Sequence, residues 1–217
     1  MSALLPALVA FAVTAATLWP LRKIALGFRI MDVPNSRKVH REPVPYLGGV
    51  AILIGAGVAI LLFRPDLWPV LLMLTFVLAV GLFDDVRYLP VWVKLLAELA
   101  IAVTAVALGF SWHVTDSNEL NAAFSVLWMV GLTNSFNLLD NMDGLASIAA
   151  ACSLAMTAAL VFATGGMALP LAGAALGFLL INRPTARMYM GDAGSLMLGF
   201  GVALASISAA NSTRGLH

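Results

Sequence analysis

Long apolar stretches alternate with short polar segments along the whole chain of 217 residues. Each stretch is about 15 to 20 residues long, which suits a helix that crosses a bilayer. The short alternating segments of a transmembrane β-barrel are absent from the sequence. The pattern predicts an all-α polytopic membrane helix bundle with about eight transmembrane helices, over residues 3–21, 47–63, 67–83, 93–110, 122–139, 145–164, 167–181 and 193–210.

The composition agrees with a membrane protein and excludes several other classes. Hydrophobic residues make up 61% of the chain and charged residues 11%, whereas soluble domains carry about 25% charged residues. No basic patch with interleaved aromatic residues occurs, so a nucleic-acid partner is not expected. The single Cys152 allows neither an internal disulfide nor a zinc site. Turn residues separate the spans without a linker, which predicts one transmembrane domain over residues 1–217.

The basic residues predict the orientation of the chain in the membrane. Of its 12 Lys and Arg residues, only Arg64 and Arg214 lie in the even-numbered connections or the C-terminal tail. The other ten follow the first, third, fifth and seventh spans, so these connections are expected in the cytoplasm and the N-terminus outside. The first span has no preceding basic residues, which favours a retained helix over a cleaved signal peptide. The predicted location is the cytoplasmic (inner) cell membrane, with multiple passes.

Five acidic residues form three sites at the ends of spans, and all three sites fall on the predicted cytoplasmic face, whereas Asp66, Asp116 and Glu119 lie in the loops expected outside. The most polar segment, residues 134–144, holds two carboxylates and three side-chain amides between two apolar stretches. Polar groups at such a place are costly unless they bind something. The parity of the connections therefore predicts that three acidic sites converge, formed by Asp84 with Asp85, Asp140 with Asp143, and Asp192.

Five carboxylates at one face suggest a hard divalent cation, Mg²⁺ with Mn²⁺ as a substitute, and Mg²⁺ in turn suggests a substrate with phosphate groups. A cationic loop on the same face holds Arg37, Lys38, His40 and Arg41.

Simpler interpretations of these residues stay open. The acids could be helix caps or stop-transfer charges, Arg37 and Lys38 could be membrane anchors, and Lys94 with Glu98 could be a local helix pair. The spacing of Gly173 and Gly177 fits a homodimer seam or, preferably, close packing within one bundle.

Four segments carry family motifs in a fixed order over residues 20 to 210. They are Asp32-Val33-Pro34 through Arg37-Lys38-Val39-His40 with residues 44–49, then Gly81-Leu82-Phe83-Asp84-Asp85, then residues 134–146, and finally Asn182 through Gly191-Asp192-Ala193-Gly194-Ser195. In these segments the chain resembles the polyprenyl-phosphate N-acetylhexosamine-1-phosphate transferases. That family includes the enzymes that load GlcNAc-1-phosphate onto undecaprenyl phosphate and the phospho-MurNAc-pentapeptide transferase.

The resemblance implies a reaction and a set of roles. A polyprenyl phosphate attacks the β-phosphate of a UDP-N-acetylhexosamine with the help of Mg²⁺, and UMP leaves. Asp192 is the implied Mg²⁺ ligand, and Asp84 and Asp85 are the implied catalytic pair at the lipid phosphate, one of them as general base. Substrate contacts are expected from Asn137, Asp140, Asp143, Lys94 and Asn182, and from Arg37, Lys38 and His40 of the cationic loop.

Two details of the resemblance bear on substrate and activity. The sequence Asp-Asn-Met-Asp-Gly at residues 140–144 is closer to the simple-sugar branch, so UDP-GlcNAc is favoured and phospho-MurNAc-pentapeptide transfer is the alternative. The implied pathway is the first membrane step of cell-wall or surface polysaccharide synthesis. Family members usually have ten or eleven spans and a later histidine loop, whereas this sequence reaches His217 after the eighth span. A C-terminally truncated, inactive fragment with partial ligand binding is therefore a further alternative, and a cation transporter would need acids nearer mid-span.

Overall fold

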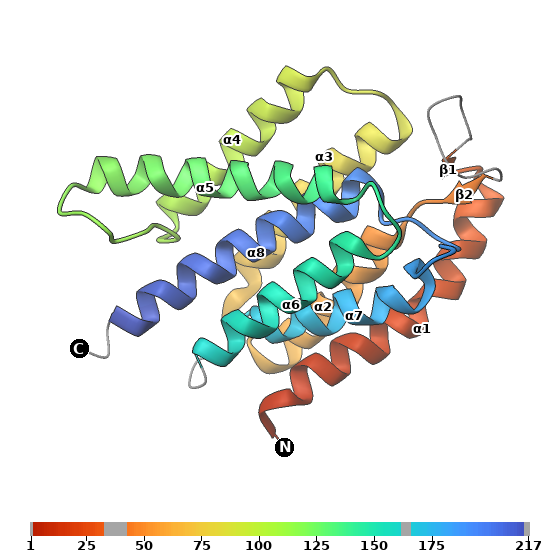
Figure 1. The fold of residues 1–217 in the computed structure, drawn as a ribbon, viewed down its shortest axis with the longest axis horizontal. Coiled ribbons are helices and arrows are strands. Elements are labelled where there is room, and N and C mark those ends of the chain that lie inside the picture. Colours follow the sequence, from red (N-terminus) through yellow and green to blue (C-terminus); the bar gives the residue numbers. More distant parts are fainter. Residues whose placement is uncertain (1, 33–42, 162–165, 215–217) are drawn as a thin grey trace.

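A computed structural model describes residues 2–32, 43–161 and 166–214, which form a helical bundle with one small hairpin (Figure 1). The described residues contain eight α-helices: α1 Leu5–Gly27, α2 Gly48–Phe63, α3 Trp68–Val86, α4 Val91–Ala107, α5 Asn118–Leu139, α6 Leu145–Leu160, α7 Ala168–Asn182 and α8 Gly191–Arg214. Two 3-10 turns, Ser2–Leu4 and Pro65–Leu67, precede α1 and α3. The antiparallel strands β1 Met31–Asp32 and β2 Val44–Pro45 were not predicted from the sequence.

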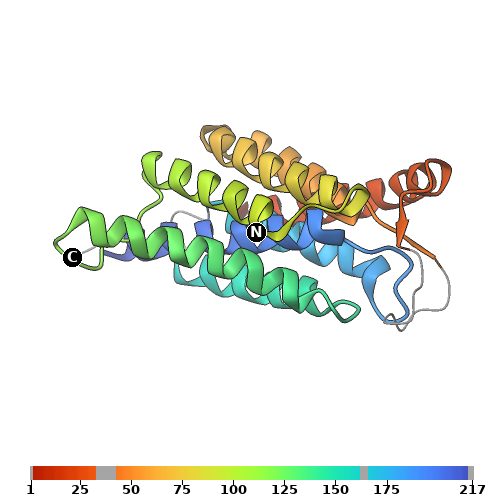
Figure 2. The ribbon, with the colours of Figure 1, turned by 90° about the horizontal axis from the view of Figure 1, so that it is seen from above.

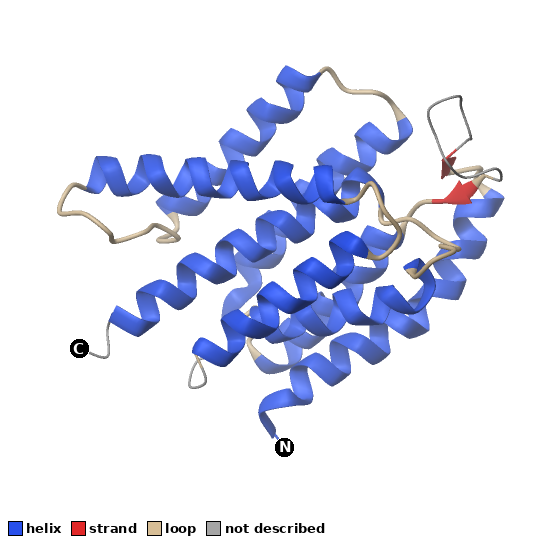
Figure 3. Cartoon of the chain, viewed as in Figure 1, coloured by secondary structure: helices blue, strands red, loops and turns tan. Residues whose placement is uncertain are grey.

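The eight predicted spans correspond one to one with the eight helices of the described residues, which confirms an all-α membrane bundle (Figure 3). Four helical segments are long and apolar enough to cross a membrane, namely Leu5–Gly27, Pro65–Val86, Asn118–Leu139 and Gly191–Ser212. Gly48–Phe63, Leu145–Leu160 and Ala168–Asn182 are apolar but shorter. The chain is thus a multi-pass membrane protein. Its orientation and the identity of the membrane stay predictions.

Helix α8 forms the centre of the bundle. In its most apolar part, 83% of the residues are buried, against 17% to 33% in the other three long apolar helices. It packs against α3, α5, α6 and α2, and Figure 2 shows it running between α3 and α4 on one side and α5 and α6 on the other. The first residues of α8 are therefore surrounded by other helices, so side chains from several helices can contact its N-terminus.

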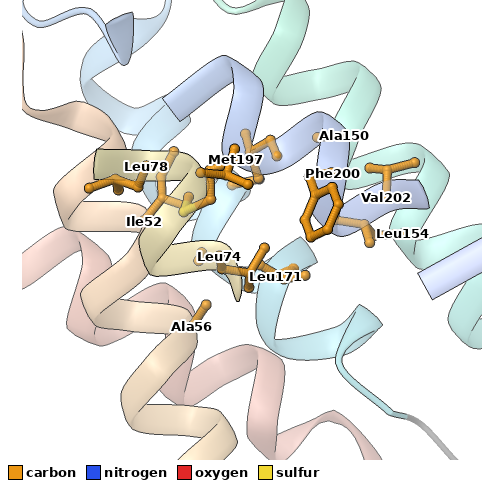
Figure 4. Packing of buried hydrophobic residues seen from close by; sticks show 14 of the residues in the cluster. Ile52, Ala56, Leu74, Leu78, Ala150, Leu154, Leu171, Met197, Phe200 and Val202 are labelled. Atoms are coloured by element: carbon orange, nitrogen blue, oxygen red, sulfur yellow. The ribbon is translucent and has the colours of Figure 1, made fainter. Parts of the chain in front are cut away.

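Interlocking side chains from several helices form the core around α8. Figure 4 shows Phe200 of α8 beside Leu154 of α6, and Met197 beside Leu78 of α3 and Ile52 of α2. All five belong to one continuous cluster of buried apolar residues. Close packing of this kind resists small displacements, so the core holds the ends of the helices in fixed relative positions.

Glycines allow α1 and α7 to pack with their backbones in contact. A methyl group at Gly173 would overlap with the backbone of Ala7, and one at Gly177 would overlap with the backbone of Phe11. The small-residue spacing on α7 therefore serves packing within one bundle, as preferred from the sequence. A homodimer stays a prediction.

The hairpin joins the first part of the chain to the start of α8. The backbone N–H groups of Gly48 and Gly49 donate to the carbonyl oxygens of Tyr189 and Met190, at 3.1 and 3.2 Å. The N–H of Tyr189 donates in return to Pro45 O at 2.9 Å. These backbone bonds tie the segment before α8 to the segment before α2. The cationic loop with Arg37, Lys38 and His40 lies outside the described residues.

Candidate active site

Lys94, near the start of α4, links two carboxylates from two other helices. Its Nζ donates to Asp84 Oδ2 of α3 at 2.7 Å and to Asp192 Oδ2 of α8 at 2.8 Å. The side chains of Lys94, Asp84 and Asp192 are only 19%, 10% and 30% exposed. Ion pairs that are shielded from water in this way are stronger and better ordered than surface pairs.

Asn137, in the last turn of α5, holds the other side of Asp192. Its Nδ2 donates to Asp192 Oδ1 at 2.9 Å and to Ser195 Oγ at 3.1 Å. The two oxygens of Asp192 thus have different partners, an ammonium group on one and an amide on the other. Residues of α4 and α5 therefore bind one carboxylate of α8, and Lys94 extends these bonds to Asp84 of α3.

Asp85 lies next to Asp84 in sequence but has a different function in the fold. Its Oδ1 and Oδ2 accept the backbone N–H groups of Asp192 at 2.9 Å and Ala193 at 3.1 Å. These are free N–H groups at the start of α8, so Asp85 caps that helix from a neighbouring helix. Gly191, with φ of +68°, leaves room for this contact, because a Cβ at that position would overlap with the Asp85 carboxylate.

Asp140 is the acid of the site whose carboxylate lacks a hydrogen-bond or ion-pair partner among the described residues. It follows the last residue of α5 and is half-buried. Burial, with smaller contributions from the negative charges of Asp192, Asp85 and Asp143, raises its pKa to about 8. A half-buried carboxyl without a partner is a candidate to bind a cation or a hydrogen-bond donor from a ligand.

Asp143 and Asn182 hold two loops of the site in place. Asp143 Oδ2 accepts the backbone N–H of Ala186 at 2.9 Å, which joins the α5–α6 and α7–α8 loops. Asn182 is 2% exposed; its Oδ1 accepts the N–H of Gly144 at 3.1 Å, and its Nδ2 donates to Met188 O at 3.2 Å. Asn182 is thus engaged within the protein, and its predicted contact with substrate would require these bonds to break.

Glu98 is a buried acid that the sequence did not place in the site. The expected local pair with Lys94 does not describe its bonding, since its Oε2 accepts a hydrogen bond from Asn134 Nδ2 of α5. Lys94 turns instead toward Asp84 and Asp192. The signal available in the sequence was an acid within an apolar span, which by itself indicates a functional position in a membrane protein.

Two tyrosines lie beside the hairpin, since Tyr46 directly follows β2 and the backbone N–H of Tyr189 donates to Pro45 O. Burial raises the pKa of the Tyr46 hydroxyl, and a hydrogen bond with Asp32 of β1 raises it further. Burial also raises the pKa of the Tyr189 hydroxyl, with smaller contributions from Asp143, Asp32 and Asp140. Both hydroxyls therefore stay protonated at neutral pH and can donate hydrogen bonds.

The carboxylates of the site suit a Mg²⁺ ion that binds together with a phosphate-bearing substrate. Among the described residues no group of three His, Cys, Asp or Glu side chains is arranged to hold a metal ion alone. Mg²⁺ usually takes one or two carboxylates and completes its shell with water and substrate phosphate. Asp192, whose side chain is 30% exposed, and Asp140, which has no side-chain partner among the described residues, are the carboxylates available for such an ion.

The predicted convergence of the three acidic sites is observed. Asp192 joins Asp84 through Lys94, Asp85 binds the start of α8, and the charges of Asp192 and Asp85 act on Asp140. The reading of Asp140 and Asp143 as caps of α6 is wrong, because Gly144 occupies the N-cap position without a side-chain hydrogen bond. Asn137 and Lys94 lie in the site as predicted, and Ser195, Glu98 and Asn134 are additions from the structure.

Comparison with known proteins identifies relatives of the same type. The sequence profile of glycosyl transferase family 4 matches residues 67–210, which include α3, α4, α5 and the part of α8 that contains Asp192 and Ser195. The chain is 32% identical over 204 residues to a probable undecaprenyl-phosphate N-acetylglucosaminyl 1-phosphate transferase of Bacillus subtilis, covering 86% of this chain and 57% of the relative. It is 34% identical over 183 residues to the undecaprenyl-phosphate alpha-N-acetylglucosaminyl 1-phosphate transferase of Thermotoga maritima, covering 82% and 56%.

A second group of relatives is less similar. The chain is 28% identical over 198 residues to a phospho-N-acetylmuramoyl-pentapeptide-transferase of Lactobacillus gasseri, covering 77% of this chain and 62% of the relative. In all three comparisons the chain spans less than two thirds of the length of its relative.

Proposed function

Because the chain belongs to glycosyl transferase family 4, we propose that it transfers a HexNAc-1-phosphate, most simply GlcNAc-1-phosphate, from a UDP-sugar to a polyprenyl phosphate. The observation that carries the proposal is the set of bonds from Lys94 to Asp84 and Asp192, completed by Asn137. It places cationic and anionic groups together at the ends of membrane helices. A soluble nucleotide sugar and a lipid phosphate can both reach such a place.

The proposed reaction exchanges one phosphoanhydride bond for another. An oxygen of the lipid phosphate attacks the β-phosphorus of the UDP-sugar, and the bond from that phosphorus to the oxygen bridging the two phosphates breaks. The electron pair of the broken bond leaves with UMP, and the lipid carries the diphospho-sugar. Catalysis of such a transfer consists mainly of positioning and of neutralising negative charge.

The residues of the site suit these tasks. Lys94 supplies a positive charge that can bind a phosphate oxygen in place of one of its two carboxylates. Asp84, which accepts a hydrogen bond from Lys94, is the proposed acceptor of a proton from the lipid phosphate. Both oxygens of Asp85 accept backbone N–H groups at the start of α8, so we propose that Asp85 positions Asp192 and does not transfer a proton.

Asp192 and Asp140 are the proposed holders of Mg²⁺. When bound, the ion supplies charge neutralisation for the diphosphate. Asn137 then keeps its hydrogen bond to Asp192 and fixes the direction of that carboxylate. Asp143, through Ala186, holds the α7–α8 loop against the nucleotide side of the site.

The sugar and the membrane are part of the proposal. The sequence Asp-Asn-Met-Asp-Gly at residues 140–144 and the names of the more similar relatives both favour UDP-GlcNAc. Undecaprenyl phosphate is the proposed acceptor and the cytoplasmic membrane the proposed location, where the product would enter cell-wall or surface polysaccharide synthesis.

The reverse half-reaction gives a direct test. The purified chain in detergent, with undecaprenyl phosphate, UDP-GlcNAc, Mg²⁺ and radiolabelled UMP, is expected to transfer label into UDP-GlcNAc. Replacing the sugar nucleotide by UDP-MurNAc-pentapeptide tests the alternative substrate, and Asp84→Asn should reduce the exchange about 100-fold or more. Absence of exchange with both nucleotides would falsify the proposal for these 217 residues.

A further inference from the structure

Glu98 of α4 is an acid buried in a membrane helix, with 5% of its surface exposed. Ionisable groups are costly in that environment, and those that occur usually have a functional role. Its carboxylate accepts from Asn134 of α5. Among the described residues, this is the only side-chain hydrogen bond between α4 and α5. The proposed reaction uses neither residue directly.

The Glu98–Asn134 bond lies directly below the site on both helices. Glu98 follows Lys94 by four residues on α4, and Asn134 precedes Asn137 by three residues on α5. Residues at these spacings share one face of a helix. Since α4 runs away from the site and α5 runs toward it, the bond lies about one helical turn, or roughly 5 to 6 Å, deeper than the bonds of Lys94 and Asn137 to Asp192.

Helix α4 has few other constraints on its position. It packs mainly against α5 and α3, and much of its surface, including Trp92, Leu96 and Val103, is exposed. Apolar contacts alone permit small rotations and axial shifts of a helix on its neighbour. A hydrogen bond between two defined side chains fixes both rotation and depth, so it also fixes where the Lys94 side chain begins.

We propose that Glu98 and Asn134 form a positioning pair that holds Lys94 within reach of both Asp84 and Asp192. The bond from Asn134 to Glu98 and the bonds of Lys94 then connect α4 to its neighbours at two levels, one helical turn apart. The consequence for catalysis rests on the proposed function, whereas the placement of Lys94 does not.

The reactivity of Lys94 measures its placement without any assay of activity. Brief acylation of the purified chain with acetic anhydride, followed by mass spectrometry, gives the ratio of modified Lys94 to modified Lys23, an exposed lysine of α1. Glu98→Leu and Asn134→Leu are expected to raise this ratio about three- to tenfold, the range expected when a hydrogen bond between membrane helices is lost. Glu98→Gln should keep the ratio of the unmodified chain, because its amide oxygen still accepts from Asn134.

Two further variants separate positioning from folding. Thr104→Val is the matched control on α4, since Thr104 is exposed and its hydroxyl donates only to the Ala100 carbonyl of its own helix. The double variant Glu98→Leu/Asn134→Leu leaves no unpaired polar group, so it should fold with nearly unchanged stability and still show the raised ratio.

The outcomes are distinct. An unchanged ratio in Asn134→Leu and in the double variant overturns the pairing, and so does a ratio in Glu98→Gln as high as in Glu98→Leu. UMP exchange measured on the same samples should fall in the leucine variants and recover in Glu98→Gln. Absence of exchange in the unmodified chain would count against the proposed function alone, because the acylation ratios still test the pair.

Discussion

The carboxylates of the site differ at the residue scale in what their oxygens already bind. Asp85 gives both oxygens to backbone N–H groups, and Asp84 and Asp192 share the ammonium group of Lys94. Asp140 has no such partner among the described residues. The same side chain thus serves as a helix cap, as half of an ion pair or as an open ligand, and the difference comes from the neighbours of each carboxylate.

Asp192 is expected to matter most for metal-dependent binding. Asp192→Asn keeps an oxygen for Asn137 but removes the negative charge, so Mg²⁺-dependent affinity for UDP-GlcNAc should fall at least about tenfold. Titration calorimetry at several Mg²⁺ concentrations measures this change. Asp116→Asn removes a charge at an exposed position and should leave the affinity unchanged. A Mg²⁺ dependence in Asp192→Asn equal to that of the unmodified chain would contradict the assignment.

Asp140 should make the stability of the protein depend on pH. Its pKa is about 8 in the fold, mainly because of burial, and near 4 in an unfolded chain. Between these values the unfolded state loses the proton while the folded state keeps it, so the carboxyl increasingly destabilises the fold as pH rises from 4 to 8. Asp140→Asn mimics the neutral carboxyl and should raise the melting temperature at pH 8.5 by more than at pH 5.

Thermal unfolding in detergent with a chelator present measures this effect. Asp116→Asn, which makes the same change of charge in an exposed loop, should show no comparable difference between the two pH values. A melting temperature of Asp140→Asn that rises equally at pH 5 and pH 8.5 would contradict the role of burial.

At the scale of elements, the start of α8 is held from three directions. Asp85 caps it, the segment before it pairs with the hairpin strand β2, and glycines of α2 and α3 pack against its first turn. A Cβ at Gly81 would lie 2.5 Å from both Ala193 N and Asp192 O, and one at Gly49 would lie 2.5 Å from Gly194 N. This packing sets the position of Asp192, since Asp192 is the second residue of α8.

Gly81→Ala should therefore shift Asp192 and lower activity strongly, while the stability of the bundle falls only moderately. We expect a loss of about 1–3 kcal/mol in unfolding free energy from overpacking, and a fall in UMP exchange of about 100-fold, because small shifts of reacting groups are costly. Gly131→Ala is the matched control, since no atom lies within 4 Å of its added methyl group. That change should be neutral or stabilise α5 by up to about 1 kcal/mol. Equal exchange rates for the two variants would argue against the packing of Gly81 as a determinant of the site.

At the scale of the whole molecule, one end of the bundle collects the functional groups. The ends of α3 and α5 and the starts of α4 and α8 meet there, and the α7–α8 loop and the hairpin lie at the same end (Figure 1). The distribution of Lys and Arg predicts that this end faces the cytoplasm. The opposite end contains the polar loop with Thr115 and Asp116.

Cysteine labelling tests that orientation. In a Cys152→Ala background, Thr115→Cys should react with a membrane-impermeant maleimide in intact cells, because its loop is expected outside. Arg87→Cys, in the exposed α3–α4 connection, should react only after lysis. The reverse pattern would mean that the bundle is inserted the other way round.

The sequence by itself determined the number and approximate bounds of the helices and the convergence of the acids at one end. Apolar span length and basic loops are local properties, and the alternation of connections follows from them by counting. The membrane environment makes this inference strong, because an apolar segment that crosses a bilayer alone must satisfy its backbone hydrogen bonds within itself, and a helix does so.

Only the tertiary structure decided which atoms meet. Asp84 and Asp85 are adjacent in sequence, yet the turn of about 100° between them points one toward Lys94 and the other toward the start of α8. Glu98 bonds to Asn134 rather than to Lys94, and Asn182 bonds within the protein. Each of these partners lies on another helix or loop, and the side-chain packing that brings them together has no local signal in the sequence.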